Sequence, residues 1–263
     1  MYAFAYERPA SLADTVAKIS AGGQALAGGQ TLIASLKQRL AQPGSLVDLG
    51  GVPELSGIKK EGNTLVIGAM TRHEFVADSA EVKSAIPGLA DLAGNIGDRQ
   101  VRAMGTMGGS VANNDPAACY PSAVLALGAT VQTNKRKIAA DDFFQGMYTT
   151  ALEEGELITA IHFPLAKKSA YAKFRQPASR FALVGVFVAQ TDQGVRVAIT
   201  GAGNGVFRHA GLEAALSKSF TPEAVEGVTI DASELNGDLH ASAAYRAQLI
   251  KVQTQRAVQQ ANA

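Results

Sequence analysis

The chain has 263 residues, of which 47% are hydrophobic and 18% are charged, and its formal net charge is +1. This length and composition predict a globular protein of one or two domains with a substantial core. The near-zero charge excludes the basic footprint that nucleic-acid-binding proteins carry.

The single cysteine, Cys119, excludes an internal disulfide and a self-contained iron–sulfur cluster, which needs several thiolates. The four histidines show no paired zinc spacing, so no metal site is predicted. The longest apolar run, residues 182–189, is far shorter than the ~20 residues of a membrane-spanning helix. Residues 1–8 lack the pattern of a signal peptide. We therefore expect a cytoplasmic protein without a membrane span, in which redox chemistry would depend on an organic cofactor.

The first 50 residues predict a strand–loop–helix–strand unit. Ser11 is expected to cap a helix over 12–19, with Asp14 as its capping-box partner. A strand over 25–27, a glycine pair, a helix over 31–40 with leucines at helical spacing and a strand over 46–49 follow. We expect the two strands to be parallel, with a right-handed crossover.

The rest of the chain predicts a second lobe and then a separate domain. Expected strands cover 64–69, 130–133 and 157–163, and expected helices cover 72–84, 88–96 and 120–127. A boundary near Pro164 divides the chain into residues 1–166, with lobes of about 1–56 and 57–166, and residues 167–263. The second domain is predicted to contain a buried strand over 182–190, a turn, an alternating strand from Val195, helices over 209–216 and 221–225, and a last helix carrying Tyr245 and Leu249.

Two glycine pairs are the candidate ligand-binding loops. They lie in Ala27-Gly28-Gly29-Gln30-Thr31 and in Thr106-Met107-Gly108-Gly109-Ser110. Glycine lets main-chain N–H groups come close to a ligand, and clustered N–H groups attract anionic oxygens. Two such loops could hold a diphosphate without a lysine, which favours a dinucleotide. Gly-Gly pairs also occur in purely structural turns, so the spacing alone leaves both interpretations open.

Other nucleotide and hydrolase motifs are not matched. The chain has no Gly-Lys dipeptide, which a P-loop requires, and no G-x-S-x-G elbow. Gly201-Ala202-Gly203-Asn204-Gly205 approaches a Rossmann fingerprint, but Val206 stands at its third glycine position, so we interpret it as a turn.

Several motifs together resemble one known family. They are Ala25-Leu26-Ala27-Gly28-Gly29-Gln30-Thr31-Leu32, Ile96-Gly97-Asp98-Arg99-Gln100 leading into Gly105-Thr106-Met107-Gly108-Gly109-Ser110, Lys173-Phe174-Arg175-Gln176-Pro177, and the closing His240-Ala241-Ser242-Ala243-Ala244-Tyr245. In this order they resemble the FAD-binding medium subunits of molybdenum hydroxylases of the xanthine dehydrogenase and carbon monoxide dehydrogenase type. The resemblance covers nearly the whole chain.

The resemblance implies a fold and a cofactor site. It implies an α+β protein, with a two-lobed FAD-binding domain of the vanillyl-alcohol oxidase (PCMH) type followed by a small α+β domain of the carbon monoxide dehydrogenase flavoprotein type. By analogy, the residues that contact FAD are Leu26, Ala27, Gly28, Gly29, Gln30, Thr31, Leu32, Ile33, Ile96, Thr106, Gly108, Gly109, Ser110, Asn113, Ile158 and Arg175.

The cationic side chain of Arg175 has an independent rationale, because it would stabilise negative charge on a reduced flavin ring. A surface strand residue is the alternative for Arg175. Valine at Gly28 or Gly109 is expected to abolish FAD retention by filling the space of the diphosphate.

Two positions depart from the family pattern. Many relatives carry Asp where this chain has Cys119, and a thiol does not accept hydrogen bonds as a carboxylate does. Gln30 stands where several flavoenzymes of this fold have His, so we expect noncovalent FAD.

The resemblance also implies a division of labour between subunits. A large subunit with the molybdenum cofactor would hydroxylate the substrate, and a small subunit with two [2Fe–2S] clusters would relay electrons to FAD in this chain, from which they pass to an external acceptor. No catalytic residue is then predicted here, and the expected assembly is a dimer of heterotrimers. Two alternatives remain open: a free-standing FAD-dependent oxidase or dehydrogenase of the same fold, and a non-enzymatic nucleotide-binding module.

Overall fold

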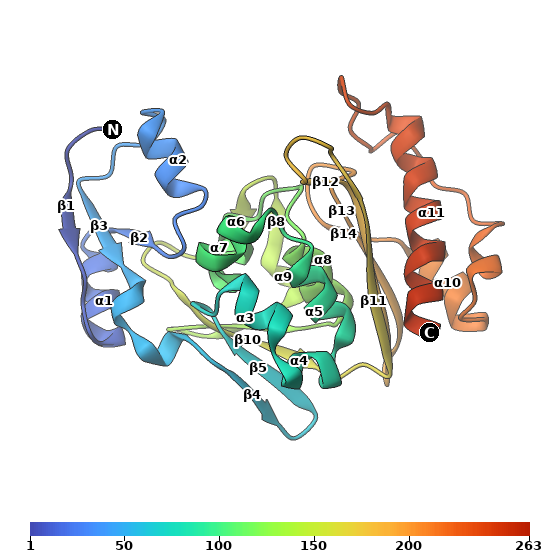
Figure 1. Cartoon of the computed structure of the whole chain (residues 1–263), viewed down its shortest axis with the longest axis horizontal. Helices are drawn as coiled ribbons and strands as arrows, with labels where there is room; N and C mark the ends of the chain where they lie inside the picture. Colours follow the sequence, from blue (N-terminus) through green and yellow to red (C-terminus); the bar gives the residue numbers. More distant parts are fainter.

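The computed structural model describes residues 1–263 and shows an α+β protein built around three main sheets. The sheets follow one another along the chain, so the colours of Figure 1 run from the first lobe on the left to the last helix on the right. The predicted fold class is confirmed. No helix combines the length and the apolar character that crossing a bilayer requires.

The first lobe is a small parallel sheet with strand order β1–β3–β2. Its elements are β1 (Ala5–Glu7), α1 (Leu12–Ser20), β2 (Gln24–Leu26), α2 (Leu32–Lys37) and β3 (Ser45–Asp48). Ser11 caps α1 as predicted, because its side chain accepts a hydrogen bond from the Asp14 amide. The predicted parallel pairing of β2 with β3 is also confirmed. Helix α2 ends before the predicted Leu40, because Arg39 adopts a left-handed conformation (φ 61°) that a helix cannot continue through.

The second lobe is an antiparallel sheet covered by helices. Two 3₁₀ helices, η1 (Leu49–Gly51) and η2 (Pro53–Leu55), lead into it, and its strand order is β4–β5–β10–β6–β7. The strands are β4 (Ile58–Glu61), β5 (Thr64–Gly68), β6 (Thr130–Thr133), β7 (Lys137–Ala139) and β10 (Ile158–Pro164), and the hairpin β8 (Phe144–Gly146) and β9 (Thr149–Thr150) lies apart. The helices are α3 (His73–Asp78), α4 (Ala80–Ala85), α5 (Pro87–Gly94), α6 (Arg99–Met104), α7 (Met107–Asn113), α8 (Tyr120–Ala126) and α9 (Ala140–Phe143).

The helix predicted over 72–84 is two helices in the structure. The break falls at Ser79, whose backbone is extended and whose side chain accepts a hydrogen bond from the Val82 amide. Ser79 therefore starts α4 instead of continuing α3, since a serine side chain that accepts from a backbone amide three residues later competes with helix continuation. Together these two helices place Val76 and Val82 in the main core.

The second glycine pair was predicted as a loop, and this was wrong. Gly108 and Gly109 form the first turn of α7, and Thr106 is its N-cap. A Cβ on Gly108 would lie 2.5–2.8 Å from atoms of Ala69, so glycine is needed for α7 to approach the end of β5. The structural reason for this pair is a tertiary contact, which the local pattern of small residues does not reveal.

The C-terminal part is an antiparallel sheet with one long helix on its outer face (Figure 1). Its elements are β11 (Lys168–Arg175), β12 (Ala182–Thr191), β13 (Gly194–Thr200), β14 (Phe207–Arg208), α10 (Ala210–Lys218), η3 (Pro222–Val225) and α11 (Ala243–Asn262). Strand β12 is buried over most of its length, as predicted. Buried Arg246 of α11 donates to the carbonyl oxygens of Leu183 and Gly201, which fixes the helix across the strand ends.

The C-terminal sheet packs directly on the helices of the second lobe. Gly88 of α5 lies so close to β11 that a Cβ there would be 2.8 Å from the Ala170 backbone. On the other side of the contact, the Thr200 hydroxyl lies within 2.8 Å of the carbonyl oxygens of Pro116 and Ala118. This packing brings the end of β11 next to α5 and the start of α8.

Candidate functional site

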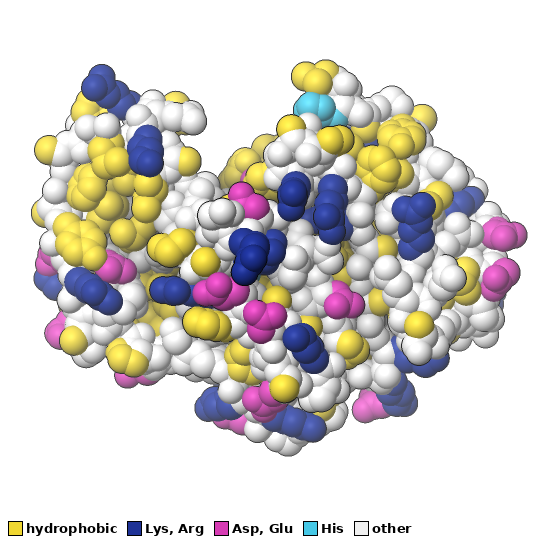
Figure 2. All heavy atoms as spheres, viewed as in Figure 1, with side chains coloured by type: hydrophobic (Ala, Val, Ile, Leu, Met, Phe, Trp, Pro, Cys, Tyr) yellow, Lys and Arg dark blue, Asp and Glu magenta, His cyan; other side chains and the backbone are white.

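A cleft of about 620 Å³ runs between the first lobe and the rest of the molecule. Figure 2 shows the surface hollowed between these two parts. The volume lies within the usual range of small-molecule sites, ~300–1,000 Å³. Of the predicted FAD-contacting residues, those that line this cleft are Ala27, Gly28, Gly29, Gln30, Thr31, Leu32, Ile96, Thr106, Gly108, Gly109, Ser110, Asn113 and Ile158. Leu26, Ile33 and Arg175 are not among the lining residues.

The first glycine loop presents unpaired main-chain donors to the cleft. No N–H group from Ala27 to Leu32 donates to a carbonyl oxygen of the protein, and all of these residues line the cleft. The loop is only partly buried, so these donors are open to a bound molecule. Because successive free N–H groups form a concavity for anionic oxygens, this loop can accept an anionic group.

The second glycine segment, unlike the first, has few free amides to present to the cleft. The amide of Met107 donates to the Thr71 carbonyl at 3.0 Å, and the amide of Gly108 donates to that of Ala69 at 2.8 Å. The Gly109 amide donates to the Thr106 hydroxyl at 3.3 Å. These amides are used within the protein, so the segment contributes mainly polar side chains to the cleft, those of Ser110 and Asn113.

The first glycine loop packs against the end of α6 and the start of α7. A Cβ on Gly28 would lie 2.2 Å from the Met104 carbonyl oxygen, and one on Gly109 would lie 3.3 Å from the Ala27 Cβ. The expected reason for glycine, space for the diphosphate, therefore needs correction at Gly28. There the missing side chain lets one segment pack against the other.

The end of the cleft nearest the C-terminal sheet carries its charged groups. Lys173 of β11 and Arg180 of the β11–β12 loop line it, together with Asp115. Arg175, two residues after Lys173, donates instead to the side chain of Asn95. Lys173 lies in the quoted motif but was not among the predicted site residues. Alternation along a strand places residues 173 and 175 on one face, and this signal could have found it.

His73 is a buried residue of the cleft that was likewise not among the predicted site residues. Its ring packs on Tyr120, with 5.2 Å between ring centroids, and its Nδ1 has no hydrogen-bond partner in the protein. Burial, together with the positive charge of Arg102, lowers the pKa of His73 to about 4. The imidazole is therefore neutral near pH 7 and contributes no charge to the cleft.

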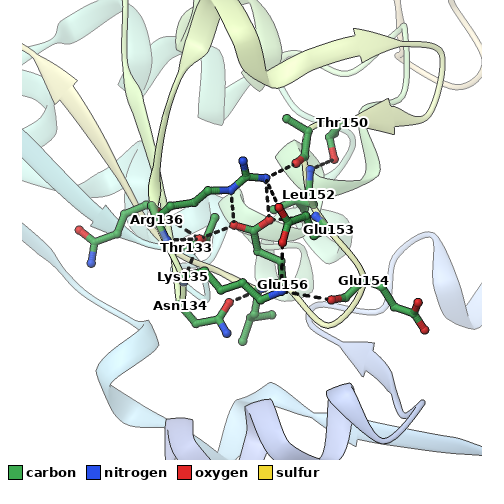
Figure 3. A network of polar contacts seen from close by, with 12 residues as sticks. Thr133, Asn134, Lys135, Arg136, Thr150, Leu152, Glu153, Glu154 and Glu156 are labelled. Atoms are coloured by element: carbon green, nitrogen blue, oxygen red, sulfur yellow. Dashed lines mark hydrogen bonds and ion pairs between the residues drawn. The ribbon is translucent and has the colours of Figure 1, made fainter.

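A polar network anchors the strand that forms the cleft floor (Figure 3). The buried Glu156 carboxylate accepts hydrogen bonds from Arg136 Nε and Nη2 at 3.1 Å and from the Thr133 hydroxyl at 2.6 Å. The hydrogen bonds from the Arg136 guanidinium lower the pKa of Glu156 to about 2. Directly after it, the Leu157 amide donates to Asn134 Oδ1 at 2.8 Å. Leu157 and Ile158 are thus held where they line the cleft.

Comparison with known proteins agrees with this geometry. Residues 2–166 match the family described as the FAD binding domain in molybdopterin dehydrogenase. The carbon monoxide dehydrogenase medium chain of Afipia carboxidovorans is 36% identical over 99% of this chain and 97% of its own length. The glyceraldehyde dehydrogenase medium chain of Sulfolobus acidocaldarius is 33% identical over 97% of this chain and 96% of its own length.

A solved structure of a relative has the same fold along the whole chain. Reconstituted CO dehydrogenase from Oligotropha carboxidovorans matches with a TM-score of 0.88 and 32% identity, covering 99% of this chain and 98% of that one. The family match, the near-complete coverage of medium chains and the cleft with its free amides agree with one another. This chain belongs to the FAD-binding medium subunits of the molybdenum hydroxylases, and it is a subunit of an oxidoreductase.

Proposed function

We propose that this chain carries electrons from [2Fe–2S] clusters of a partner subunit, through its FAD, to an external acceptor. The observation that carries the proposal is the row of unpaired N–H groups from Ala27 to Leu32 in the cleft. The near-complete match to medium chains of multi-subunit dehydrogenases supports it. When bound, FAD supplies the redox chemistry, and the residues of the chain bind and orient it.

We assign the following roles to the cleft residues. The loop Leu26–Ile33 wraps the diphosphate, with its free amides pointing at the anionic oxygens. Thr106, Gly108, Gly109 and Ser110 border it from the opposite wall. Ile96, Asn113, Ile158 and Arg175 contact other parts of FAD. No residue of this set acts as a general acid or base, because electron transfer through FAD needs none from this chain.

The electrons must enter from another subunit. A single cysteine cannot ligate an iron–sulfur cluster within this chain, and the comparisons place the chain among medium subunits. We propose a small subunit with two [2Fe–2S] clusters and a large subunit with the molybdenum cofactor as its partners, in a dimer of heterotrimers.

We also propose two domains, residues 1–166, with lobes of about 1–56 and 57–166, and residues 167–263. The sheet arrangement supports this division, since no sheet combines strands from both sides of residue 166. It also supports the division of the first domain, because β1–β3 end before residue 56 and β4 begins after it.

A reduction experiment tests the proposed route. The FAD-loaded chain is mixed anaerobically either with the reduced iron–sulfur subunit or with aldehydes, purines, N-heterocycles or carbon monoxide. We expect the flavin absorption to bleach only with the iron–sulfur subunit. Bleaching by a small substrate alone would identify a free-standing oxidase, and a chain that retains no flavin would be a nucleotide-binding module of another kind. Light scattering of the complex from the native host measures its stoichiometry.

A further inference from the structure

Lys173 is a cation held at the cleft by neutral groups only. Its Nζ donates to the carbonyl oxygen of Asn95 at 2.6 Å, to that of Arg180 at 3.1 Å and to Cys119 Sγ at 3.4 Å. An ammonium group has three donors, so all of them are used and the group is fixed in place. No carboxylate lies within ion-pair distance of Lys173, whereas Glu156, which directly precedes the cleft residue Leu157, is paired with Arg136.

The contacts of Lys173 join three separate segments. Asn95 follows α5 and Cys119 precedes α8, both in the second lobe, while Lys173 and Arg180 belong to β11 and the following loop. Lys173, Cys119 and Arg180 all line the cleft. The charge of Lys173 therefore lies where the C-terminal sheet borders the cleft. None of the three groups that Lys173 contacts is a carboxylate, and the Asp115 carboxylate, which also lines this end, makes no ion pair with it.

We propose that Lys173 raises the reduction potential of a flavin bound in the cleft, and that Cys119 preserves this effect by placing a neutral thiol where a carboxylate would neutralise the ammonium group. This inference rests on the proposed function. A flavin ring gains negative charge when it is reduced, so a fixed cation on the cleft wall favours the reduced form. The three donors of Lys173 are already occupied, so it acts on the flavin through its charge and not through a hydrogen bond. We therefore call it a positioning residue.

The lining of this end of the cleft supports its use by the flavin ring. Ile96 and Phe181 directly follow Asn95 and Arg180, whose carbonyl oxygens bind Lys173, and supply apolar surface there; the Phe181 side chain is half exposed. Planar aromatic rings bind to such surfaces. The opposite part of the cleft, at the first glycine loop, offers amide donors for the diphosphate.

The test is a spectroelectrochemical titration of flavin in the FAD-loaded complex. Lys173→Gln removes the charge, and Cys119→Asp leaves Lys173 in place but pairs it with a carboxylate. Both variants should lower the equilibrium constant for two-electron reduction about tenfold, a fall of ~30 mV in midpoint potential. Lys173→Arg and Cys119→Ser, which keep the charge unpaired, should keep the wild-type potential.

Lys168→Gln is the matched control on the same strand. Lys168 bonds to Asn262 at the far end of β11, five residues and about 17 Å from Lys173 at ~3.4 Å per residue. That distance is about twice the Debye length in physiological salt. We therefore expect the flavin midpoint potential of Lys168→Gln to equal that of the wild type. A wild-type potential in Lys173→Gln or in Cys119→Asp, with FAD bound, would overturn the inference and leave the proposed function intact. A wild-type chain that retains no FAD would instead refute the proposed function.

Discussion

Gly28 lies against the carbonyl oxygen of Met104 so closely that a Cβ on Gly28 would come within 2.2 Å of that oxygen. This contact joins the first glycine loop to the segment before α7. Main-chain atoms form the obstacle, so a larger residue cannot be accommodated by a change of rotamer. The width of the cleft at the proposed diphosphate site therefore depends on glycine at this position.

Gly28→Ala should separate the two segments and weaken FAD binding at least tenfold. Adding a side chain to a well-packed region of this kind lowers the free energy of unfolding by about 1–3 kcal/mol. Equilibrium dialysis with FAD measures the affinity, and urea denaturation measures the stability. Gly44→Ala is the matched control, since a Cβ there meets no atom within 4 Å. Equal FAD affinities of the two variants would contradict the role given to the contact with Met104.

Thr106→Ala should destabilise the chain by about 1 kcal/mol, the usual cost of losing an N-cap side chain. The Thr106 hydroxyl accepts from the Gly109 amide and caps α7. Thr106→Ser keeps that hydroxyl and should restore the free energy of unfolding measured in urea. If serine and alanine behave alike at this position, the cap is not what stabilises α7.

Glu156→Gln should cost about 2–3 kcal/mol of stability near pH 7, because it removes the buried charge that Arg136 pairs with; this is somewhat less than the full pKa shift corresponds to, since solvent screens the partly exposed Arg136 guanidinium. The pKa of Glu156 is lowered from 4.5 to about 2, and each unit corresponds to about 1.4 kcal/mol. A carboxyl whose pKa is lowered by folding stabilises the native state above its unfolded pKa, and this contribution is lost as the pH falls from about 4.5 to about 2.

The wild-type chain should therefore lose stability in that acid range, and the part due to Glu156 should be missing in Glu156→Gln. Denaturant titrations at several pH values measure the difference. Glu154→Gln is the control, because its exposed side chain lies two residues away. A loss in the Glu154 variant as large as that in the Glu156 variant would argue against the network of Figure 3 as the cause.

His73 should make the protein less stable as the pH falls from about 6.5 to about 4. Burial lowers the pKa of His73 from 6.5 to about 4, so the unfolded chain binds this proton more readily than the native one. The loss amounts to about 3 kcal/mol once the pH is below both values. His73→Phe keeps an aromatic ring beside Tyr120 and should remove this part of the pH dependence, whereas His240→Gln, at an exposed position, should keep it. A pH profile that is unchanged in His73→Phe would assign the effect to another group.

The sequence predicted individual elements well where one local pattern decided them. The serine cap at Ser11 reports how one helix begins, and the apolar run of β12 reports that one strand is buried. The ordered motifs also predicted the family, and most residues assigned by that resemblance line a single cleft.

Only the tertiary structure decided what the two glycine pairs do. The amides from Ala27 to Leu32 remain free, whereas Met107 and Gly108 donate to Thr71 and Ala69, residues almost forty positions earlier in the chain. It likewise decided that Lys173 is surrounded by carbonyl oxygens and a thiol from three segments. A local sequence pattern determines the conformation that a segment prefers. The partners of its polar groups come from distant segments, and they are set only when the lobes and the C-terminal sheet pack together.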